Sequence, residues 1–443
     1  MDNKRKFDKV INLAKSRGFI FPSSEIYGGL NSIYDYGPLG VELKNNIKKV
    51  WWNFMVSHRN IIGLDSSILM HPKIWEASGH IKGFNDLLVD CKKCKSRWRV
   101  DDLEKNICPE CGGELTKRRN FNLMFKTSMG PVEKENNIVY LRPETAQGIY
   151  VNFLNVKESM RMKLPFGIAQ IGKAFRNEIT PGNSIFRMRE FEQMEMQYFV
   201  KENESKKVFN KWKELRKQWY IDLGVNEKNI NFNNHNKKDL AHYAKEAIDI
   251  EYNFGFSKKN PFKELEGIHN RGNFDLKQHQ KYSKQKLTVK ELNNGEYLPN
   301  VIETSIGVDR ALLMFLIDSY EEIDGGRSVT KKSIKDKEIV LKLHPKLAPI
   351  KIAILPLSKK EKLINKAKEI YDILVKYYRI QYDETGSIGK RYRRQDEIGT
   401  PYCLTVDFDS LKDKKVTIRD RDSMKQERID MSSLKNYFSN KFI

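Results

Sequence analysis

The sequence lacks several features that would assign a protein to a common class directly. It has no apolar run of 18 residues, which argues against a membrane-spanning helix. Its opening residues, MDNKRKFDKVINLAKSRGFIF, contain no continuous apolar stretch and no small-residue cleavage site, so we expect no signal peptide and a cytoplasmic location. It has no G-x-x-x-x-G-K phosphate loop, no G-x-G-x-x-G motif, no internal repeat and no Ser-His-Asp order typical of a hydrolase. Membrane proteins, P-loop proteins and serine hydrolases are therefore not expected.

Cysteine is scarce, with five residues in 443, but four of the five are grouped. Two C-x2-C pairs are separated by 13 residues, and Gly-Gly follows the second pair. Disulfides do not explain this pattern in a cytosolic protein, whereas a zinc ribbon does, because four thiolates bind zinc tetrahedrally and leave no open position. We predict a structural zinc site and keep reduced, metal-free thiols as the alternative. The predicted ligands are Cys91, Cys94, Cys108 and Cys111; Cys403 lies in an apolar strand and is expected to be buried.

The chain has an excess of positive charge. It contains 80 Lys and Arg residues against 58 Asp and Glu residues, a net charge of +22. Such an excess favours a polyanionic partner, with nucleic acid first. The alternative is compositional, because an AT-rich genome raises the Lys content without any function. With 39% hydrophobic residues over this length, we expect two or three domains with sizeable cores.

Residues 169–199 alternate in polarity in two runs. In the second run Gln193, Glu195 and Gln197 share one face. Between the runs, 180–184 has the Pro, Gly and Asn residues of a turn. The pattern predicts a long antiparallel hairpin. An ordinary half-solvated hairpin is the alternative, but the apolar flanks favour a polar face that lines a pocket.

Two further stretches place polar side chains where a strand meets a helix. In 140–150 these are Arg142 and Glu144. In 298–319 a strand ends near Glu303, a helix begins at Gly307, and Arg310 lies in its first turn. A cation at a helix N-terminus opposes the helix dipole, so we expect Arg310 to have an anionic partner; a solvated Arg is the alternative.

Two helices have a second possible role. The helix expected over 41–56 has an apolar stripe that favours packing on the core, with a dimer interface as the alternative. From 345 onward, strands alternate with helices and predict a separate α/β domain. Its helix 388–398 is strongly basic and is a candidate phosphate-binding element; a solvated basic helix is the alternative.

Several of these segments resemble known synthetase motifs. FRNEITPGNSIFRMREFEQMEMQYF resembles motif 2 of class II aminoacyl-tRNA synthetases, GVDRALLMFL resembles motif 3, and YDYGPLGVELKNNIKKVWW resembles the motif 1 region of the glycine enzymes. LRPETAQGIYVNF, PFKELEGIHNRGNFDL and PNVIETSIGVDR are similar to the homodimeric type of glycyl-tRNA synthetase. LHPKLAPIKIAILPL and GSIGKRYRRQDEIGTPYCLTVDF resemble the anticodon-binding domain shared by the glycine, histidine, proline and threonine enzymes. Thr304 departs from the family's E-P-S-x-G pattern, and we expect it to loosen the strand–helix turn.

The resemblance implies the fold and the assembly. We expect an α+β protein whose class II catalytic domain, 1–340, is built on a mostly antiparallel sheet with helices. A zinc-ribbon insertion is expected at about 88–118 and a helical, polar insertion at about 200–295. An α/β anticodon-binding domain is expected at 345–443. The resemblance also implies a homodimer that pairs through the helix at 41–56.

The resemblance further implies a two-step reaction, in which glycine and ATP form glycyl-adenylate and pyrophosphate, and glycine then passes to the 3′ end of tRNA(Gly). Arg176 and Arg310 are the expected catalytic residues, and Glu264 is a candidate Mg²⁺ ligand. The remaining residues expected to contact ATP are Asn177, Glu178, Phe186, Arg187, Met188, Arg189, Glu190, Phe191, Leu265, Gly307, Val308 and Asp309. Those expected to contact glycine are Arg99, Glu144, Phe191, Glu192, Gln193, Met194, Glu195, Glu303, Thr304, Ser305, Ile306 and Gly307. Those expected to contact tRNA are Arg391, Arg393 and Arg394.

Two other functions compete with this hypothesis. A non-catalytic tRNA- or DNA-binding paralogue would keep the fold without the chemistry. A synthetase for histidine, proline or threonine would keep the chemistry and change the amino acid. The ATP and glycine residues are intact, which a binding-only protein does not need, and the ETSIG and FEQME segments favour glycine.

Overall fold

The expected hairpin forms the centre of the molecule. The computed structural model describes residues 3–100, 103, 105–131, 137–179, 182–236, 240, 244–257, 260–291, 295–325, 327 and 337–442. The hairpin's arms are β10 (Phe166–Phe175) and β11 (Glu190–Val200), paired antiparallel from Phe166 opposite Phe199 to Phe175 opposite Glu190. Of the predicted turn, Thr180 and Pro181 lie outside the described residues.

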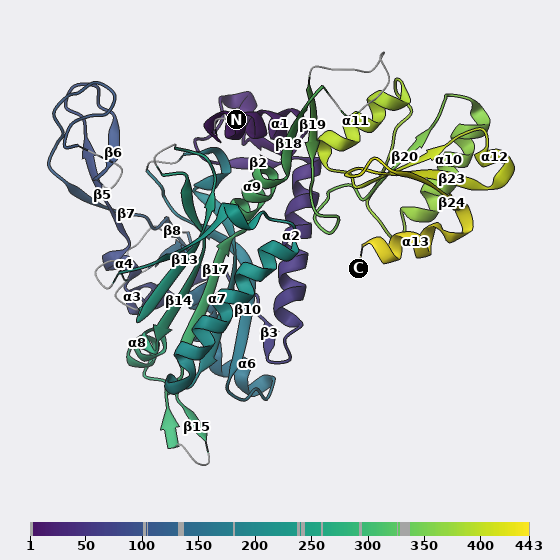
Figure 1. Ribbon diagram of the computed structural model, residues 1–443. Helices are drawn as coiled ribbons and strands as arrows, with labels where there is room; N and C mark the ends of the chain where they lie inside the picture. The colour runs from purple at the N-terminus through teal and green to yellow at the C-terminus, as the bar shows by residue number, and fades with distance from the viewer. Residues whose placement is uncertain are drawn as a thin grey trace.

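The hairpin belongs to a seven-stranded sheet with the order β12-β13-β14-β17-β11-β10-β3 (Figure 1). All neighbours are antiparallel except β3 and β10. The mostly antiparallel sheet of the expected α+β fold is therefore confirmed. The other strands are β3 (Ile61–Gly63), β12 (Ile230–Asn234), β13 (Glu246–Asn253), β14 (Phe262–Gly272) and β17 (Asn300–Gly307).

The sheet is covered by helices whose buried side chains repeat with helical spacing. The largest core cluster joins the sheet to α1 (Asn3–Ser16), α2 (Pro38–Val56), α7 (Ser205–Asp222) and α9 (Val308–Ser319). A second cluster joins it to α5 (Ala146–Val151), α6 (Phe153–Ser159) and α8 (Phe274–Ser283). Because neighbouring residues of a strand point to opposite faces, Phe199 in the second cluster shares its face with Glu195 and Gln197. The polar face of the hairpin therefore lies on the side of α5 and α8.

The structure corrects the expected insertion at 200–295. This stretch supplies α7 and three strands of the main sheet, β12, β13 and β14, so it is an integral part of the central sheet. We expected a strand at the end of 241–256 and another at 263–268, and both are present, as β13 and β14. The polar composition did not show that they join the main sheet: Ile248, Ile250 and Tyr252 are buried, while the residues between them are only partly buried. Beyond α8, the segment ends in a small hairpin of β15 (Val289–Glu291) and β16 (Gly295–Tyr297).

The four-cysteine segment forms a small unit that projects from the sheet (Figure 1). Its three strands are β5 (Asn85–Asp90), β6 (Arg97–Arg99) and β7 (Arg119–Asn122). At its base lie α3 (Lys73–Ala77), α4 (His80–Gly83) and a three-stranded sheet of β4 (Leu69–Met70), β9 (Ile138–Leu141) and β8 (Lys126–Ser128). The unit therefore starts and ends a few residues outside the expected 88–118.

The C-terminal part has its own five-stranded sheet and core, as expected for an α/β domain. The strand order is β21 (Ile380–Tyr382), β20 (Ile352–Pro356), β22 (Tyr402–Val406), β23 (Lys415–Asp420) and β24 (Gln426–Asp430). Its longer helices are α10 (Glu361–Leu374), α11 (Ile388–Ile398) and α13 (Leu434–Lys441). Cys403 is buried in β22, as predicted. A hairpin of β18 (Tyr320–Asp324) and β19 (Lys337–Leu341) connects the two parts.

None of the described helices is long and apolar enough to cross a membrane. Thr304 does not loosen the strand–helix turn as expected: β17 runs unbroken to Gly307, and α9 begins at Val308. Thr304 itself is buried in mid-strand, opposite Met196 on β11 and Ile268 on β14.

Candidate active site

Two rows of polar residues run across the central sheet. In the first, Gln170, Glu195, Ser305 and Gly267 are successive partners on β10, β11, β17 and β14. In the second, Gln197, Glu303 and His269 are partners on β11, β17 and β14. Side chains two residues apart on a strand point the same way, so both rows face one side of the sheet. The alternating polar residues of the strands thus form one polar surface of the sheet, which we call the polar floor.

A cavity opens on this floor, and most of the residues expected to bind ATP and glycine line it. The expected residues that line it are Glu144, Arg176, Glu178, Phe186, Arg187, Met188, Phe191, Gln193, Glu195, Glu264, Leu265, Glu303, Ser305, Gly307, Asp309 and Arg310. Ile185, Gly267, His269 and Arg271 line it as well and were missed. The period of two in PFKELEGIHNRG, which puts Gly267, His269 and Arg271 on one strand face, was the available signal.

Other expected residues lie outside the cavity lining: Asn177, Arg189, Glu190, Glu192, Met194, Thr304, Ile306 and Val308. Arg99 is also outside, because it lies on β6 of the projecting unit, where it pairs with Asp86 at 3.2 Å. Met194, Ile306 and Val308 are fully buried in the core instead. Glu192 pairs with Lys44 and Lys48 of α2.

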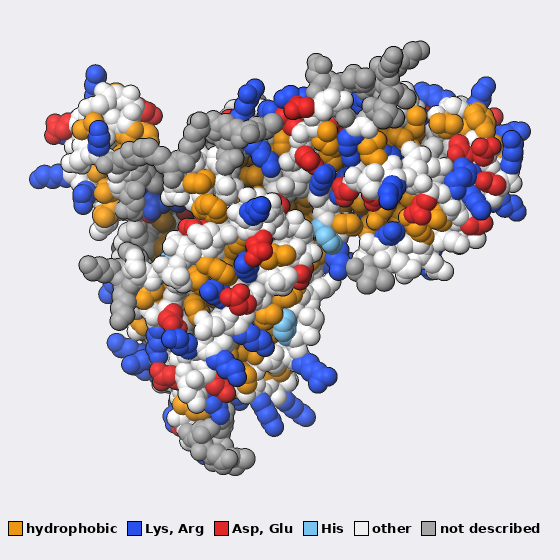
Figure 2. Space-filling view, viewed as in Figure 1, with side chains coloured by type: hydrophobic (Ala, Val, Ile, Leu, Met, Phe, Trp, Pro, Cys, Tyr) orange, Lys and Arg blue, Asp and Glu red, His pale blue; other side chains and the backbone are white. Residues whose placement is uncertain are grey.

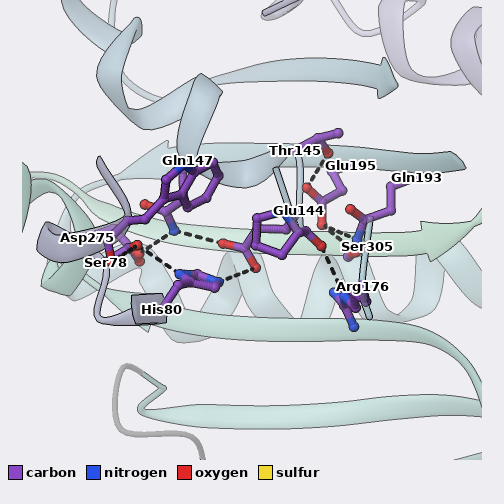
Figure 3. Close-up of polar contacts among 12 residues, drawn as sticks. Ser78, His80, Glu144, Thr145, Gln147, Arg176, Gln193, Glu195, Asp275 and Ser305 are labelled. Atoms are coloured by element: carbon purple, nitrogen blue, oxygen red, sulfur yellow. Dashed lines mark hydrogen bonds and ion pairs between the residues drawn. The ribbon is translucent and has the colours of Figure 1, made fainter. Parts of the chain in front are cut away.

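Glu195 occupies the centre of the polar floor and is 2% exposed. Its Oε1 accepts hydrogen bonds from Ser305 Oγ at 2.6 Å and from Gln193 Nε2 at 3.2 Å, and its Oε2 accepts one from Thr145 (Figure 3). Burial and the nearby charges of Glu303 and Glu144 raise the pKa of Glu195 to about 7, against these hydrogen bonds. Glu195 is therefore a buried carboxyl group whose hydrogen-bond partners are neutral side chains.

Glu303, by contrast, already has cationic partners. Arg271 Nη1 donates to both of its oxygens, at 3.2 and 3.1 Å, and His269 Nδ1 lies 2.8 Å from Oε1. Gln197 Nε2 donates to Oε2 at 2.7 Å. Burial raises the pKa of Glu303, but the Arg271 charge and the His269 hydrogen bond outweigh it and lower the pKa to about 2. Glu303 is therefore ionised.

Glu144 reaches the cavity from the turn before α5. Its Oε1 accepts a hydrogen bond from Gln147 Nε2 at 2.8 Å, and His80 Nε2 lies 3.5 Å from Oε2 (Figure 3). Burial raises the pKa of Glu144, but the His80 and Arg271 charges and the hydrogen bonds hold it below its ordinary value. The floor thus holds two ionised carboxylates beside the titratable Glu195.

Arginines lie elsewhere in the same cavity. Arg176 donates from Nε to the Pro143 carbonyl at 3.0 Å, and its guanidinium packs over the ring of Phe191 at 5.2 Å. Arg310, in the first turn of α9, lies with Nη1 3.3 Å from Glu264 Oε2. The Arg310 charge lowers the pKa of Glu264. The anionic partner expected for Arg310 is therefore Glu264 in this structure.

Two of the expected ATP residues have contrasting surroundings. Glu178 is 8% exposed, and its buried Oε2 has no hydrogen-bond partner among the residues that the structure describes. Asp309 is fully engaged: it accepts from the Glu192 backbone N–H at 2.8 Å, from Lys44 at 3.1 Å and from Tyr36. Asp309 thus ties α2 and β2 (Tyr34–Tyr36) to the hairpin, whereas Glu178 is left with a free acceptor.

The four grouped cysteines converge as expected. Their sulfur atoms all lie within 4.8 Å of one another, with Cys91 and Cys111 Sγ 3.5 Å apart and Cys94 and Cys108 Sγ 3.6 Å apart. Tetrahedral coordination with bonds of about 2.3 Å places sulfurs about 3.8 Å apart. The cluster therefore has the donor set and the spacing of a tetrahedral metal site.

The basic helix α11 contradicts one of the expected tRNA contacts. Arg391 is 2% exposed, and its guanidinium donates to the carbonyls of Pro356, Asp383 and Leu357 at 2.6 to 3.3 Å. It is a structural residue, because those carbonyls use its donors inside the fold. Arg394 is partly exposed and pairs with Asp383, and Arg393 is also partly exposed.

Comparisons with known proteins agree with the site. Residues 125–320 match the family described as tRNA synthetase class II core domain (G, H, P, S and T), and 351–441 match the family described as anticodon binding domain. A glycine–tRNA ligase of Treponema denticola is 54% identical over 98% of this chain and 96% of its own length. Those of Borrelia hermsii (54% identical, 98% and 96% covered) and Alkaliphilus oremlandii (51% identical, 100% and 99% covered) are similar over the same extent. The expected resemblance is thereby confirmed, and the chain belongs to the class II aminoacyl-tRNA synthetases, in the family of the glycine–tRNA ligases.

Proposed function

We propose that this chain activates glycine with ATP and transfers it to the 3′ end of tRNA(Gly). The observation that carries the proposal is the cavity that joins three carboxylates, Glu144, Glu195 and Glu303, to Arg176 and Arg310. A small ammonium compound suits the first group, and a polyphosphate suits the second. Adenylate formation needs positioning and charge neutralisation more than a protein nucleophile, and these residues supply both.

At the glycine end, Glu195 is the main partner of the ammonium group. Burial and the Glu303 and Glu144 charges raise its pKa, and the positive charge of the substrate would favour the ionised carboxylate. Glu144 adds a second carboxylate, and Ser305 fixes Glu195 from the neighbouring strand. Discrimination against a methyl group by lost contacts is worth only about 1–3 kcal/mol, so the packed floor must exclude larger amino acids sterically.

At the ATP end, the planar guanidinium of Arg176 suits the α-phosphate and the substrate carboxylate. Phe191 offers a ring for the adenine to stack on, and the unpaired Glu178 Oε2 can accept from the exocyclic amine. Arg187 and Arg310 are the candidates for the β- and γ-phosphates. Arg310 would exchange its Glu264 partner for phosphate, which leaves Glu264 as a candidate ligand of Mg²⁺; Mg²⁺ would neutralise charge on the phosphates.

Zinc is the metal that we propose for the cysteine cluster, with a structural role, because four thiolates fill its coordination shell. For tRNA we propose the α11 face that carries Arg393 and Arg394. Figure 2 shows Lys and Arg side chains spread over both parts of the molecule in view, so charge alone does not select that face. A cytoplasmic location is part of the same proposal.

We also propose a homodimer that pairs through the motif 1 region around α2. Sedimentation at micromolar concentration should give twice the mass of the chain, and a monomer there would contradict this part of the proposal. A monomer would not by itself contradict the proposed activity, because all the lining residues of the cavity described above come from one chain.

Amino-acid-dependent ATP–pyrophosphate exchange, run with each of the twenty amino acids, tests the activity. We expect exchange with glycine alone, followed by glycine transfer to tRNA(Gly). Exchange with histidine, proline or threonine instead of glycine would show that the amino-acid substrate is a different one. The absence of exchange with every amino acid would favour a binding-only protein.

A further inference from the structure

Glu144 has a partner, His80, to which the proposed function assigns no role. His80, the first residue of α4, has its Nε2 3.5 Å from Glu144 Oε2. Gln147 of α5 donates to the other carboxylate oxygen at 2.8 Å. Figure 3 shows His80 and Gln147 approaching Glu144 from different segments. Each oxygen therefore has its own partner, and together the two partners fix the rotation of the carboxylate.

The imidazole of His80 is itself held in place. Ser78, which is 6% exposed, has its Oγ hydrogen-bonded to His80 Nδ1 at 2.8 Å. The ring packs edge-on against Trp75 at 5.5 Å and tilted against Phe84 at 5.3 Å. The His80 backbone carbonyl accepts from Asn122 Nδ2 at 3.1 Å. Because backbone, ring plane and Nδ1 are all constrained, Nε2 has one direction left, toward Glu144.

We infer that His80 is a positioning residue for glycine activation, which orients the Glu144 carboxylate toward the ammonium group of the substrate. The inference rests on the proposed function, since it assigns Glu144 to glycine. Without the imidazole, Gln147 alone would hold the carboxylate by one oxygen, and the second oxygen would lose its partner. His80 need not touch the substrate to have this effect.

His80 lies where the cysteine unit joins the rest of the fold. The segment that carries it leads directly from α4 into β5 and the cysteine unit, and Asn122 lies on β7, the strand that returns from that unit. One short segment thus anchors both the projecting unit and Glu144. The base of the unit therefore lies beside Glu144, although Arg99 on its β6 strand lies outside the cavity.

Two substitutions separate positioning from packing. His80→Phe keeps a flat ring against Trp75 and Phe84 but removes the Nε2 donor. His80→Gln gives up the ring but can place an amide donor near the position of Nε2. His71→Phe is the matched control, because His71 is exposed and lies outside the cavity.

The KM values for glycine and for ATP would be measured in ATP–pyrophosphate exchange on the full-length protein. For His80→Phe we expect the glycine KM to rise by about tenfold or more while the ATP KM stays within about twofold. For His80→Gln we expect a glycine KM close to that of the unaltered enzyme. A purely structural role for the ring predicts the reverse order, with Phe better than Gln.

An unchanged glycine KM in folded His80→Phe would overturn the inference alone, since the unaltered enzyme would still exchange with glycine. Failure of the unaltered enzyme to exchange would overturn the proposed function and the inference together. If His80→Phe does not fold, His80→Asn replaces it, because the shorter amide reaches the Nδ1 position rather than Nε2. The Asn variant should then show the raised glycine KM that Gln avoids, and equal values for Asn and Gln would overturn the inference.

Discussion

Ser305 donates a hydrogen bond from Oγ to Glu195 Oε1 at 2.6 Å, between directly opposed positions of β17 and β11. Thr145 donates to the other oxygen from the segment before α5. The carboxyl group is therefore fixed from two sides in the middle of the sheet, with its pKa raised to about 7. A carboxyl group held in this way is suited to bind a cation.

Replacing Glu195 by Ala should abolish glycine activation while ATP still binds. The side chain that meets the ammonium is lost, but the arginines of the cavity remain. Glycine-dependent exchange and a separate ATP titration measure the two effects. Glu202→Ala is the control, because Glu202 is an exposed carboxylate paired with Lys245. Near-normal exchange in Glu195→Ala would refute the assigned role.

Glycine use should depend on pH through Glu195. Its pKa is raised by burial and by Glu303 and Glu144, so the group is neutral below about pH 7 and ionised above it. Since only the carboxylate attracts an ammonium group, kcat/KM for glycine should rise with pH through about 7 and fall toward tenfold per unit well below it. A profile of kcat/KM against pH measures this. Glu303, with a pKa of about 2, adds no step in that range, so a flat profile would contradict the Glu195 assignment.

Removing the metal should unfold the projecting unit and leave the main sheet intact. Among the described residues, the core cluster around the cysteines is Val89, Cys91, Cys108 and Leu115, and two of these are proposed ligands. So small a core rarely supports a fold without a metal or a disulfide. Metal analysis should find about one zinc per chain, and chelation or Cys108→Ser should make the unit sensitive to proteases. A protease-resistant unit after complete chelation would contradict the zinc site.

Glu266→Ala should destabilise the catalytic part strongly. Arg216 and Glu266 are both fully buried, with Nε 2.7 Å from Oε1, and Tyr220 donates to the other oxygen at 2.5 Å. Breaking such a pair leaves a buried charge and costs about 3–5 kcal/mol. Urea unfolding measures the loss. The paired replacement Arg216→Met with Glu266→Leu should restore most of it, whereas Glu202→Ala at the exposed pair should change stability by less than about 1 kcal/mol.

Substitutions of the α11 arginines should affect either the stability of the domain or the binding of tRNA. Arg391→Ala should destabilise the C-terminal domain, because three backbone carbonyls lose their buried donor. Arg393→Glu should instead raise the KM for tRNA, more at low salt than at high salt, without changing glycine-dependent exchange. Aminoacylation assays over a range of salt, with thermal unfolding alongside, distinguish the two. An unchanged tRNA KM for Arg393→Glu would favour a merely solvated helix.

The local patterns of the sequence were sufficient for several elements. The alternation in 169–199 predicted the hairpin and the shared face of Gln193, Glu195 and Gln197, because a strand has a fixed period of two. The cysteine spacing predicted the cluster, since C-x2-C brings two thiolates to one metal regardless of the fold around it. Motifs recognised by resemblance supplied the family, which the comparisons confirmed.

Only the tertiary structure decided which residues meet. Strand order brings His269 and Arg271 to Glu303, and no local period encodes the order of strands in a sheet. The burial of Arg391 gave it a structural role instead of a tRNA contact. The sequence could not show this, because a basic helix has the same sequence pattern whether its side chains reach water or carbonyl groups inside the fold. The same holds for His80 and Glu144, which lie 64 positions apart in the sequence and within 3.5 Å in space. The sequence by itself determined the chemistry and the local geometry, whereas long-range packing determined which charges share the cavity, because desolvation and pairing act only between groups that the fold has brought together.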